Sequence, residues 1–267
     1  KKALVKTLVE KDTMFMHGKK IIVSGPQDDR VIRAFNNVRF YKTDMSGKCD
    51  SLHSSTKNEL TQLIGKPVLW NNENQMTGNV MHLIGNNETE KLDSLKVLNN
   101  AFIIQKDSLS KNGFNQMKGQ NLFGRFEENK LKEVDIIKNA ESIYYIYNDK
   151  NEFVGIRKSV CSRINLEMNE NKIETMTGFN NTESNIYPDN EFPENARKLR
   201  GFAWRGDERI LSKENIFPEE ELAIDAKVQI DAQKKAIESE KPMEIQKETL
   251  EYDEKNPKPK DKTVKKL

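Results

Sequence analysis

The sequence predicts an all-β protein assembled from repeated antiparallel hairpins, and three observations lead to this fold class. A phrase at residues 74–95, NQMTGNVMHLIGNNETEKLDSL, returns at residues 115–134 as NQMKGQNLFGRFEENKLKEV. Apolar and polar residues alternate through both copies, as they do along half-buried strands. Hydrophobic residues make up 35% of the chain and charged residues 32%, which favours thin layers with one solvated face over a thick core.

Four repeated units can be aligned, with a period of roughly 30 to 40 residues. Each unit begins with a short stretch of strand-forming residues, at 36–41, 66–70, 100–104 and 141–147. Each ends with a turn and two apolar residues three positions apart, which are Leu60/Leu63, Leu92/Leu95, Leu131/Val134 and Ile173/Met176. Helical repeats would need long amphipathic stretches, whereas these units are dense in Asn, Gly, Thr and Val. We therefore expect strands separated by polar turns.

Three of the units share a Met-x-Gly motif between these two features. The motif occurs as Met45-x-Gly47, Met76-x-Gly78 and Met117-x-Gly119. We expect each glycine to permit a bulge or a bend, while the methionine fills an irregular gap beneath it.

The two ends of the repeat array differ in sequence character. Residues 1–198 carry the repeats, and two prolines within residues 187–198 end them. We expect residues 199–217 to form a capping segment that covers the last strand, and residues 218–267 to form a charged tail. A weakly amphipathic helix should begin this tail, followed by a disordered Pro/Lys-rich stretch. At the N-terminal end a strand-like sequence begins at once, so the edge of the first strand is expected to pair with preceding sequence or with a partner.

The charge balance and the cysteines exclude several classes of function. The chain has 44 basic and 42 acidic residues, so no overall positive field favours nucleic acid. No apolar run approaches the ~18 residues that a membrane-spanning helix needs. Cys49 and Cys161 lie far apart and outside any Cys-x-x-Cys motif, which argues against a zinc site or a redox dithiol. Two separate small apolar residues are favoured over one disulfide.

Catalytic and metal-binding motifs are missing from the sequence. His17, His53 and His82 stand singly, with no second ligand at metal-binding spacing. The nucleophile-elbow, phosphate-loop, dinucleotide-binding and zinc-protease motifs do not occur. Asp207 and Glu208 are flanked by arginines and are interpreted as a charged surface turn with local ion pairs. We therefore predict no catalytic residues, no metal and no cofactor.

Stacked hairpins would give two facing sheets, or one sheet folded into a trough, because a single hairpin is only marginally stable. Large alternating residues are predicted to line the interior: Val38, Phe40, Val68, Trp70, Leu83, Phe102, Ile104 and Tyr145. These residues could simply fill the core of a sandwich. Alternatively, the sheets could diverge so that the same residues line a lipid-binding groove. Alternation alone does not separate the two interpretations.

Several long phrases carry a family resemblance. EKDTMFMHGKKI, IRAFNNVRFYKTDMSGKCDSL, PVLWNNENQMTGNVMHLI, GFNQMKGQNLFGRF and ARKLRGFAWRGDERI are similar to the OstA-like proteins of Bacteroidetes-type bacteria. That family is related to the periplasmic lipopolysaccharide transport protein LptA and to the N-terminal domain of the outer-membrane translocon LptD. The resemblance covers residues 1–217 and implies an elongated antiparallel β-jellyroll, V-shaped in section, whose apolar interior shields lipid A acyl chains.

The resemblance also implies a function. It predicts a non-enzymatic periplasmic component of lipopolysaccharide transport, working between the inner and outer membranes, with the eight lining residues above as its lipid-binding groove. Its partners would be lipopolysaccharide and other jellyroll proteins joined by strand addition, among them an LptD-like translocon, an inner-membrane LptC-like component, or further copies of itself. A signal peptide and further strands would precede this segment, and the chain could associate with the outer membrane. The alternative is a structural or adaptor β-solenoid that binds an outer-membrane partner or a glycan without carrying lipid.

Overall fold

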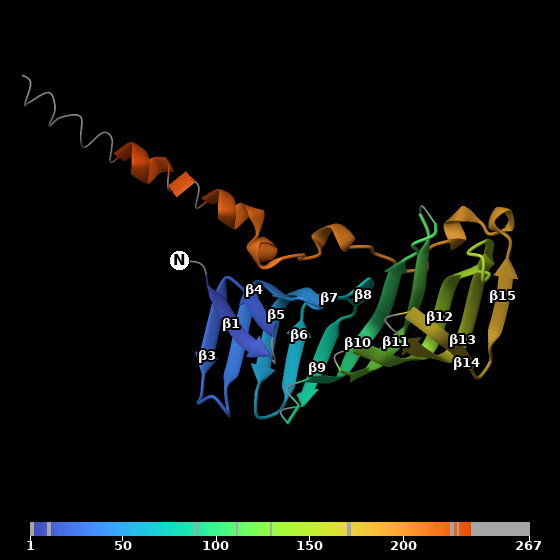
Figure 1. The fold of residues 1–267 in the computed structure, drawn as a ribbon, viewed down its shortest axis with the longest axis horizontal. Coiled ribbons are helices and arrows are strands. Elements are labelled where there is room, and N and C mark those ends of the chain that lie inside the picture. The colour runs from blue at the N-terminus through green and yellow to red at the C-terminus, as the bar shows by residue number, and fades with distance from the viewer. Residues whose placement is uncertain are drawn as a thin grey trace, which may run out of the picture. The chain divides into compact units, whose positions relative to one another are not determined.

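A computed structural model describes residues 3–9, 12–86, 88–89, 91–110, 112–128, 130–169, 172–224, 227–228 and 230–235. The chain divides into two compact units, Lys1–Ile216 and Phe217–Leu267. The first unit contains every strand of the protein's described part (Figure 1). The second unit is helical at residues 219–224, 227–228 and 230–235. The predicted disordered end of the tail lies outside the described residues.

The prediction of an all-β fold made of antiparallel hairpins is confirmed for the first unit. Its strands are β1 (Leu4–Val9), β2 (Asp12–His17), β3 (Lys20–Ser24), β4 (Val31–Lys42), β5 (Met45–Ser55), β6 (Leu60–Ile64), β7 (Val68–Asn71), β8 (Asn74–Thr77), β9 (Val80–Asn86), β10 (Lys91–Lys106), β11 (Phe114–Glu127), β12 (Lys130–Tyr147), β13 (Phe153–Asn169), β14 (Lys172–Phe179) and β15 (Glu183–Tyr187). Four 3-10 turns follow: η1 (Asp189–Glu191), η2 (Glu194–Ala196), η3 (Gly206–Glu208) and η4 (Lys213–Ile216).

The long strands bend in the middle, and the bend assigns their two halves to different sheets. In β4, the register against β5 shifts between Phe35 and Val38, and the intervening Asn36 and Asn37 have φ of 61° and 57°. The same left-handed pairs recur in β10 and β12, at Asn99/Asn100 and Lys138/Asn139. Asparagine tolerates this backbone region better than most residues. The predicted unit starts at residues 36 and 100 therefore lie at bends within longer strands.

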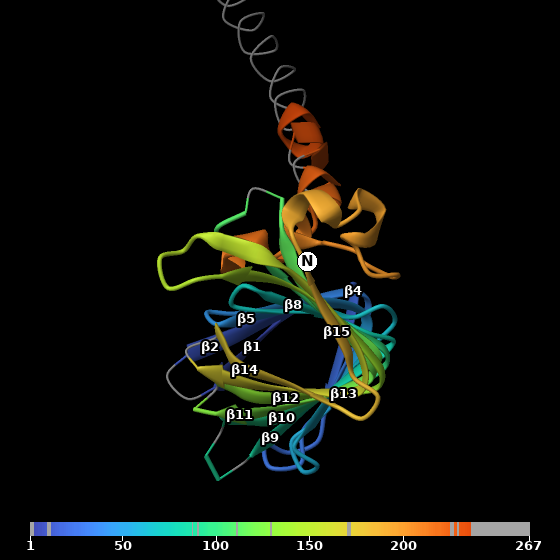
Figure 2. The ribbon, with the colours of Figure 1, turned by 90° about the vertical axis from the view of Figure 1, so that its right-hand side faces the viewer.

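Two facing sheets result, joined by the bent strands, and Figure 2 looks along their row of strands. The first, here called the cap sheet, contains β1, β2, the second half of β4, the first half of β5, β7, β8, the second half of β10, the first half of β11, the second half of β12, the first half of β13 and β15. The opposite sheet contains β3, β6, β9, β14 and the remaining halves of the long strands.

Apolar side chains from both sheets meet in an inter-sheet core. Its buried members include Val38, Phe40, Leu63, Leu95 and Ile136, and it extends from β2 to β13. The Met-x-Gly motifs lie on this core: Met76 and Met117 belong to it and Met45 packs against it. A side chain at Gly47 would overlap the ring of Phe40. At Gly78 it would overlap the side chain of Val97, and at Gly119 that of Ile136. These glycines therefore leave room for a neighbouring side chain. The expected bulge or bend is absent at Gly47, which pairs regularly with Phe40 and Leu69.

Residues 188–216, here called the cap, lie across the outer face of the cap sheet. A second cluster of buried apolar residues joins them to it: Phe102, Ile104, Ile143, Tyr145 and Ile156 from the sheet, with Phe192 and Leu199 from the cap. Phe202 contacts Phe114 with ring centroids 5.2 Å apart, and Trp204 contacts the same ring at 5.3 Å. The cap was expected to cover the edge of the last strand. Instead it runs back over the face, because the apolar outer side chains of β10, β12 and β13 need cover there.

Candidate functional site

Seven of the eight predicted lining residues lie in the cap sheet, on its two faces, and Leu83 lies in β9 of the opposite sheet. Val38 and Phe40 belong to the inter-sheet core, and Leu83 packs against it. These three lie where a groove between the sheets would place them. Their role in lipid binding stays a prediction.

The other five lie on the outer face, contrary to the expected lining. Phe102, Ile104 and Tyr145 belong to the cluster beneath the cap. Val68 and Trp70 flank Leu69 of the inter-sheet core, so alternation turns them outward. Both are buried, at 0% and 1% exposure. The physical reason is that this sheet is covered on both faces, so both faces of its strands carry apolar side chains. The sequence pattern then does not show which face a given residue occupies.

Side chains fill the space between the sheets. A small cavity of about 10 Å³ lies between Ile103 and Met117 of the cap sheet and Leu166 and Met168 of the opposite sheet. That volume is close to the space of one water molecule. Of the two interpretations left open by the sequence, this arrangement corresponds to a filled sandwich.

The inter-sheet core is rich in methionine. Every methionine in the described ranges lies in the inter-sheet core or against it: Met14, Met16, Met45, Met76, Met81, Met117, Met168 and Met176. Methionine is unbranched and adjusts its shape to irregular gaps and varied ligands. The core can therefore repack around a guest more readily than one made of branched residues.

The inter-sheet core is open to solvent at both ends of the strand row. In the structure's described portion, β1 and β3 at one end and β14 and β15 at the other each pair with a single neighbour. Val23 is the partner of Ile32, which packs against the core, yet Val23 is 50% exposed. At the far end Ile186 is 57% exposed and pairs with Arg157, whose Nη2 contacts Met176 of the core margin. Inward-facing apolar side chains and free strand edges thus coincide at both ends.

The repeated Asn-Gln-Met phrase positions one side chain on each face of the cap sheet. Met76 and Met117 enter the inter-sheet core, while Gln75 and Gln116 point outward to the cap. Gln116 donates from Nε2 to the Arg197 carbonyl at 2.7 Å and accepts from the Leu199 N–H at 2.9 Å. Gln75 does the same two strands away, donating to the Ala203 carbonyl and accepting from the Arg205 N–H. The glutamine of each repeat therefore holds the cap by hydrogen bonds to the backbone of the cap.

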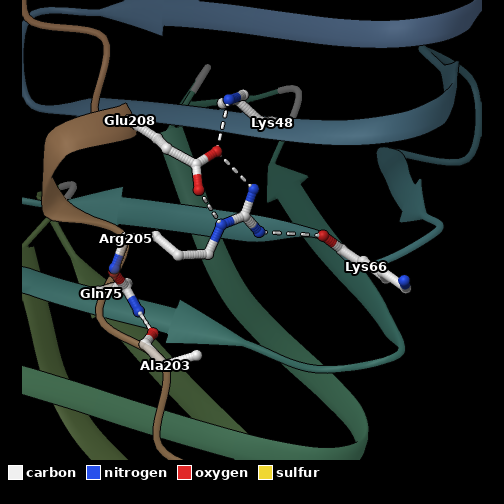
Figure 3. A network of polar contacts seen from close by, with 6 residues as sticks. All are labelled: Lys48, Lys66, Gln75, Ala203, Arg205 and Glu208. Atoms are coloured by element: carbon white, nitrogen blue, oxygen red, sulfur yellow. Dashed lines mark hydrogen bonds and ion pairs between the residues drawn. The ribbon is translucent and has the colours of Figure 1, made fainter.

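An ion-pair network beside Gln75 continues this attachment (Figure 3). Arg205 donates from Nε and Nη2 to the two carboxylate oxygens of Glu208, both at 2.8 Å. Lys48 of β5 reaches Glu208 Oε2 at 2.6 Å. The Arg205 bonds, with a smaller contribution from Lys48, hold the pKa of Glu208 at about 2, below its ordinary 4.5. The expected charged surface turn is thus an attachment point between cap and sheet.

Acid is expected to weaken this attachment. Because the folded pKa of Glu208 is depressed, its contribution to stability is present above pH 4.5 and is lost as the pH falls towards about 2. Glu208→Gln should therefore unfold at lower urea than the wild type at pH 7, and the difference should shrink between pH 4.5 and 2. Asp207→Asn, at an exposed neighbouring position, is the matched control. A difference that stays constant over this range would contradict the assignment.

A broad groove lies on the outer surface between the cap and the ends of β11, β12 and β13. Its volume is about 1140 Å³, and its lining includes Phe114, Tyr145, Phe153, Phe192 and Arg197. The aromatic rings form a connected group, with Phe153 6.2 Å from Tyr145 and 5.6 Å from Tyr147 between centroids. Arg197 is engaged in ion pairs with Asp189 and Glu194.

The two cysteines and two of the histidines occupy positions that indicate a structural role. Cys49 and Cys161 are free and buried. Burial raises the pKa of the Cys49 thiol to about 12 and also raises that of Cys161, which leaves both thiols protonated and unreactive at neutral pH. His53 and His82 both contact Gln62 across neighbouring strands. Among the described residues, no group of three or more His, Cys, Asp or Glu side chains could hold a metal ion. No helix in the described ranges is both long and apolar enough to cross a membrane.

Comparison with known proteins gives a likeness in structure and none in sequence. No protein-family model matches the sequence, and no curated protein matches it. The chain is similar to the crystal structure of LptH, described as the LptA-homologous periplasmic component of the lipopolysaccharide transport device of Pseudomonas aeruginosa. The TM-score is 0.41 at 14% sequence identity, and the match covers 55% of this chain and 99% of LptH.

Proposed function

We propose that the protein is a non-enzymatic carrier of lipopolysaccharide in the periplasm, with the inter-sheet core as the surface that shields the acyl chains. The observation that carries the proposal is the apolar inner face itself. It passes through successive hairpins from β2 to β13 and emerges at both ends beside free strand edges. A further jellyroll that added strands at either end would extend the same apolar interior.

The energetic need for such a surface is large. Each CH₂ group removed from water contributes about 0.8 kcal/mol, so a chain of about twelve carbons exposed to water costs about 10 kcal/mol. Side chains pack between the sheets, so an acyl chain must enter by displacing some of them. The methionines of the core supply that adaptability. Energy for directional movement must come from outside this chain. The partners in this proposal are an LptC-like inner-membrane component, an LptD-like translocon or further copies of the chain.

A second candidate function is an adaptor that binds a glycan or an outer-membrane partner on its outer surface. The aromatic groove of about 1140 Å³ beside the cap favours it. In that case the inter-sheet core is a structural filling and takes up no lipid.

A pair of photocrosslinkers separates the two functions. Benzoylphenylalanine at position 40 faces the inter-sheet core, and at position 102 it faces the cap. Both sites replace a buried phenylalanine, with exposures of 3% and 5%, so they are matched in burial. We expect lipopolysaccharide to be captured in cells from position 40 and not from position 102. Capture of protein alone, or capture of lipopolysaccharide only from position 102, would contradict lipid carriage between the sheets.

A further inference from the structure

A continuous row of side-chain amides crosses the inner face of the cap sheet. Asn71 pairs with Asn74, Asn74 with Gln105, and Gln105 with Asn115, so the four amides occupy neighbouring positions on four successive strands. Each lies two residues from an inward-facing core residue, which are Leu69, Met76, Ile103 and Met117 respectively. Alternation therefore turns all four towards the space between the sheets. We call this set the amide row.

The amide row lies at the side of the sandwich where the hairpins turn. Asn71 and Asn74 close the β7–β8 hairpin, while Gln105 and Asn115 stand next to the ends of β10 and β11. The 10 Å³ cavity is bordered on one side by Asn74, Gln105 and Asn115. On its other side are Leu166, Met168 and Ile173 of the opposite sheet, which are all apolar. The turn side of the interior is thus polar on one wall and apolar on the other.

Two members of the amide row, Asn71 and Asn74, have unused hydrogen-bonding capacity although they are buried, while Gln105 is half-buried. Asn71 is 0% exposed and Asn74 is 3% exposed. Asn71 Nδ2 donates to the Asp44 carbonyl at 3.2 Å, but its Oδ1 has no hydrogen-bond partner, and neither does Nδ2 of Asn74. Asn115 Oδ1 accepts from the Tyr145 N–H at 2.9 Å. Buried polar atoms are nearly always paired, so an unpaired acceptor and an unpaired donor side by side point to a ligand that supplies both.

We infer that the amide row binds the ester or amide linkage through which acyl chains join a lipid headgroup. This inference rests on the proposed lipid carriage and specifies how the lipid is oriented. The row is uncharged, so it suits neutral carbonyl and hydroxyl groups rather than phosphate, which attracts Arg and Lys. Acyl chains that enter between the sheets from the turn side place their carbonyls beside the row, with the chains among the methionines and the headgroup outside.

Two lipids that differ only in the linkage test this inference. One is a phosphatidylglycerol with two ester-linked myristoyl chains, and the other has ether-linked chains of the same length and therefore no carbonyls. Binding is measured on the full chain by displacement of the apolar fluorescent dye phenylnaphthylamine. The wild type should bind the ester lipid about five- to tenfold more tightly, since a lost partner for a buried polar group costs about one factor of ten. Asn74→Leu and Gln105→Leu should bind both lipids equally.

The outcomes separate this inference from the proposed function. If the wild type binds neither lipid and neither displaces the dye, lipid carriage itself fails. If the wild type binds both lipids with equal affinity, or if Asn74→Leu and Gln105→Leu keep the ester preference, the amide row does not bind the ester linkage. Gln120→Leu, at an exposed position of β11, is the matched control and should keep the wild-type preference. Circular dichroism of each variant checks that the strands remain intact.

Discussion

Phe40→Ala is expected to lower the free energy of unfolding by about 3–5 kcal/mol, the range for truncating a buried phenylalanine. Phe40 is 3% exposed and lies in the inter-sheet core, and its ring occupies the space that a side chain on Gly47 would need. Urea unfolding followed by circular dichroism measures the change. Leu8→Ala, at a position 73% exposed, should change stability by no more than about 0.5 kcal/mol.

A double-mutant cycle shows whether the ring and the glycine are coupled. Gly47→Ala alone should destabilise by about 1–3 kcal/mol, because the added methyl overlaps the Phe40 ring. In the double variant the ring is gone and the methyl partly fills its cavity, so the total loss should fall short of the sum by about 1 kcal/mol or more. Strict additivity would show that Gly47 serves the backbone rather than this packing.

Gln116→Leu is expected to destabilise the protein by about 2–4 kcal/mol. The substitution leaves the Arg197 carbonyl and the Leu199 N–H without their partner at a position 1% exposed. Each unpaired buried group costs about 1–3 kcal/mol, and water that reaches a loosened cap reduces the sum. Gln75→Leu should act similarly through Ala203 and Arg205. Urea unfolding gives the energies of both variants.

Trypsin provides a second readout for the same contacts. A cap released from Gln75 and Gln116 should be cleaved after Lys198, Arg200 or Arg205 faster in the double variant than in the wild type. Gln120→Leu, whose side chain bonds only to exposed Asn99, should leave cleavage unchanged. Equal cleavage rates in all variants would mean that the aromatic contacts of the cap hold it without the glutamines.

The repeated Asn-Gln-Met phrase is visible in the sequence, but the role of its glutamine becomes clear only in the tertiary structure. Alternation along a strand places Gln75 and Met76 on opposite faces, yet it gives no reason for a buried glutamine. That reason is the backbone of residues 197–205, which lie more than 80 positions from Gln116 and about 130 from Gln75. Contacts at such separation leave no periodic signal in one sequence.

The doubled asparagines were the signal that sequence reasoning passed over. Asn36-Asn37 and Asn99-Asn100 mark the bends where β4 and β10 pass from one sheet to the other. A pair of left-handed residues within an otherwise strand-like run could have located these crossings, because asparagine is enriched in that conformation. With the crossings known, the two facing sheets and the length of each strand follow.

The sequence by itself determined the class of the fold and the antiparallel hairpins. These properties are local, since side chains alternate at each step along a strand. Only the tertiary structure decided that Phe102, Ile104 and Tyr145 face the cap and that the inner face carries the amide row. A sheet buried on both faces shows no apolar preference between them, so the face that each residue occupies depends on which distant segment covers it.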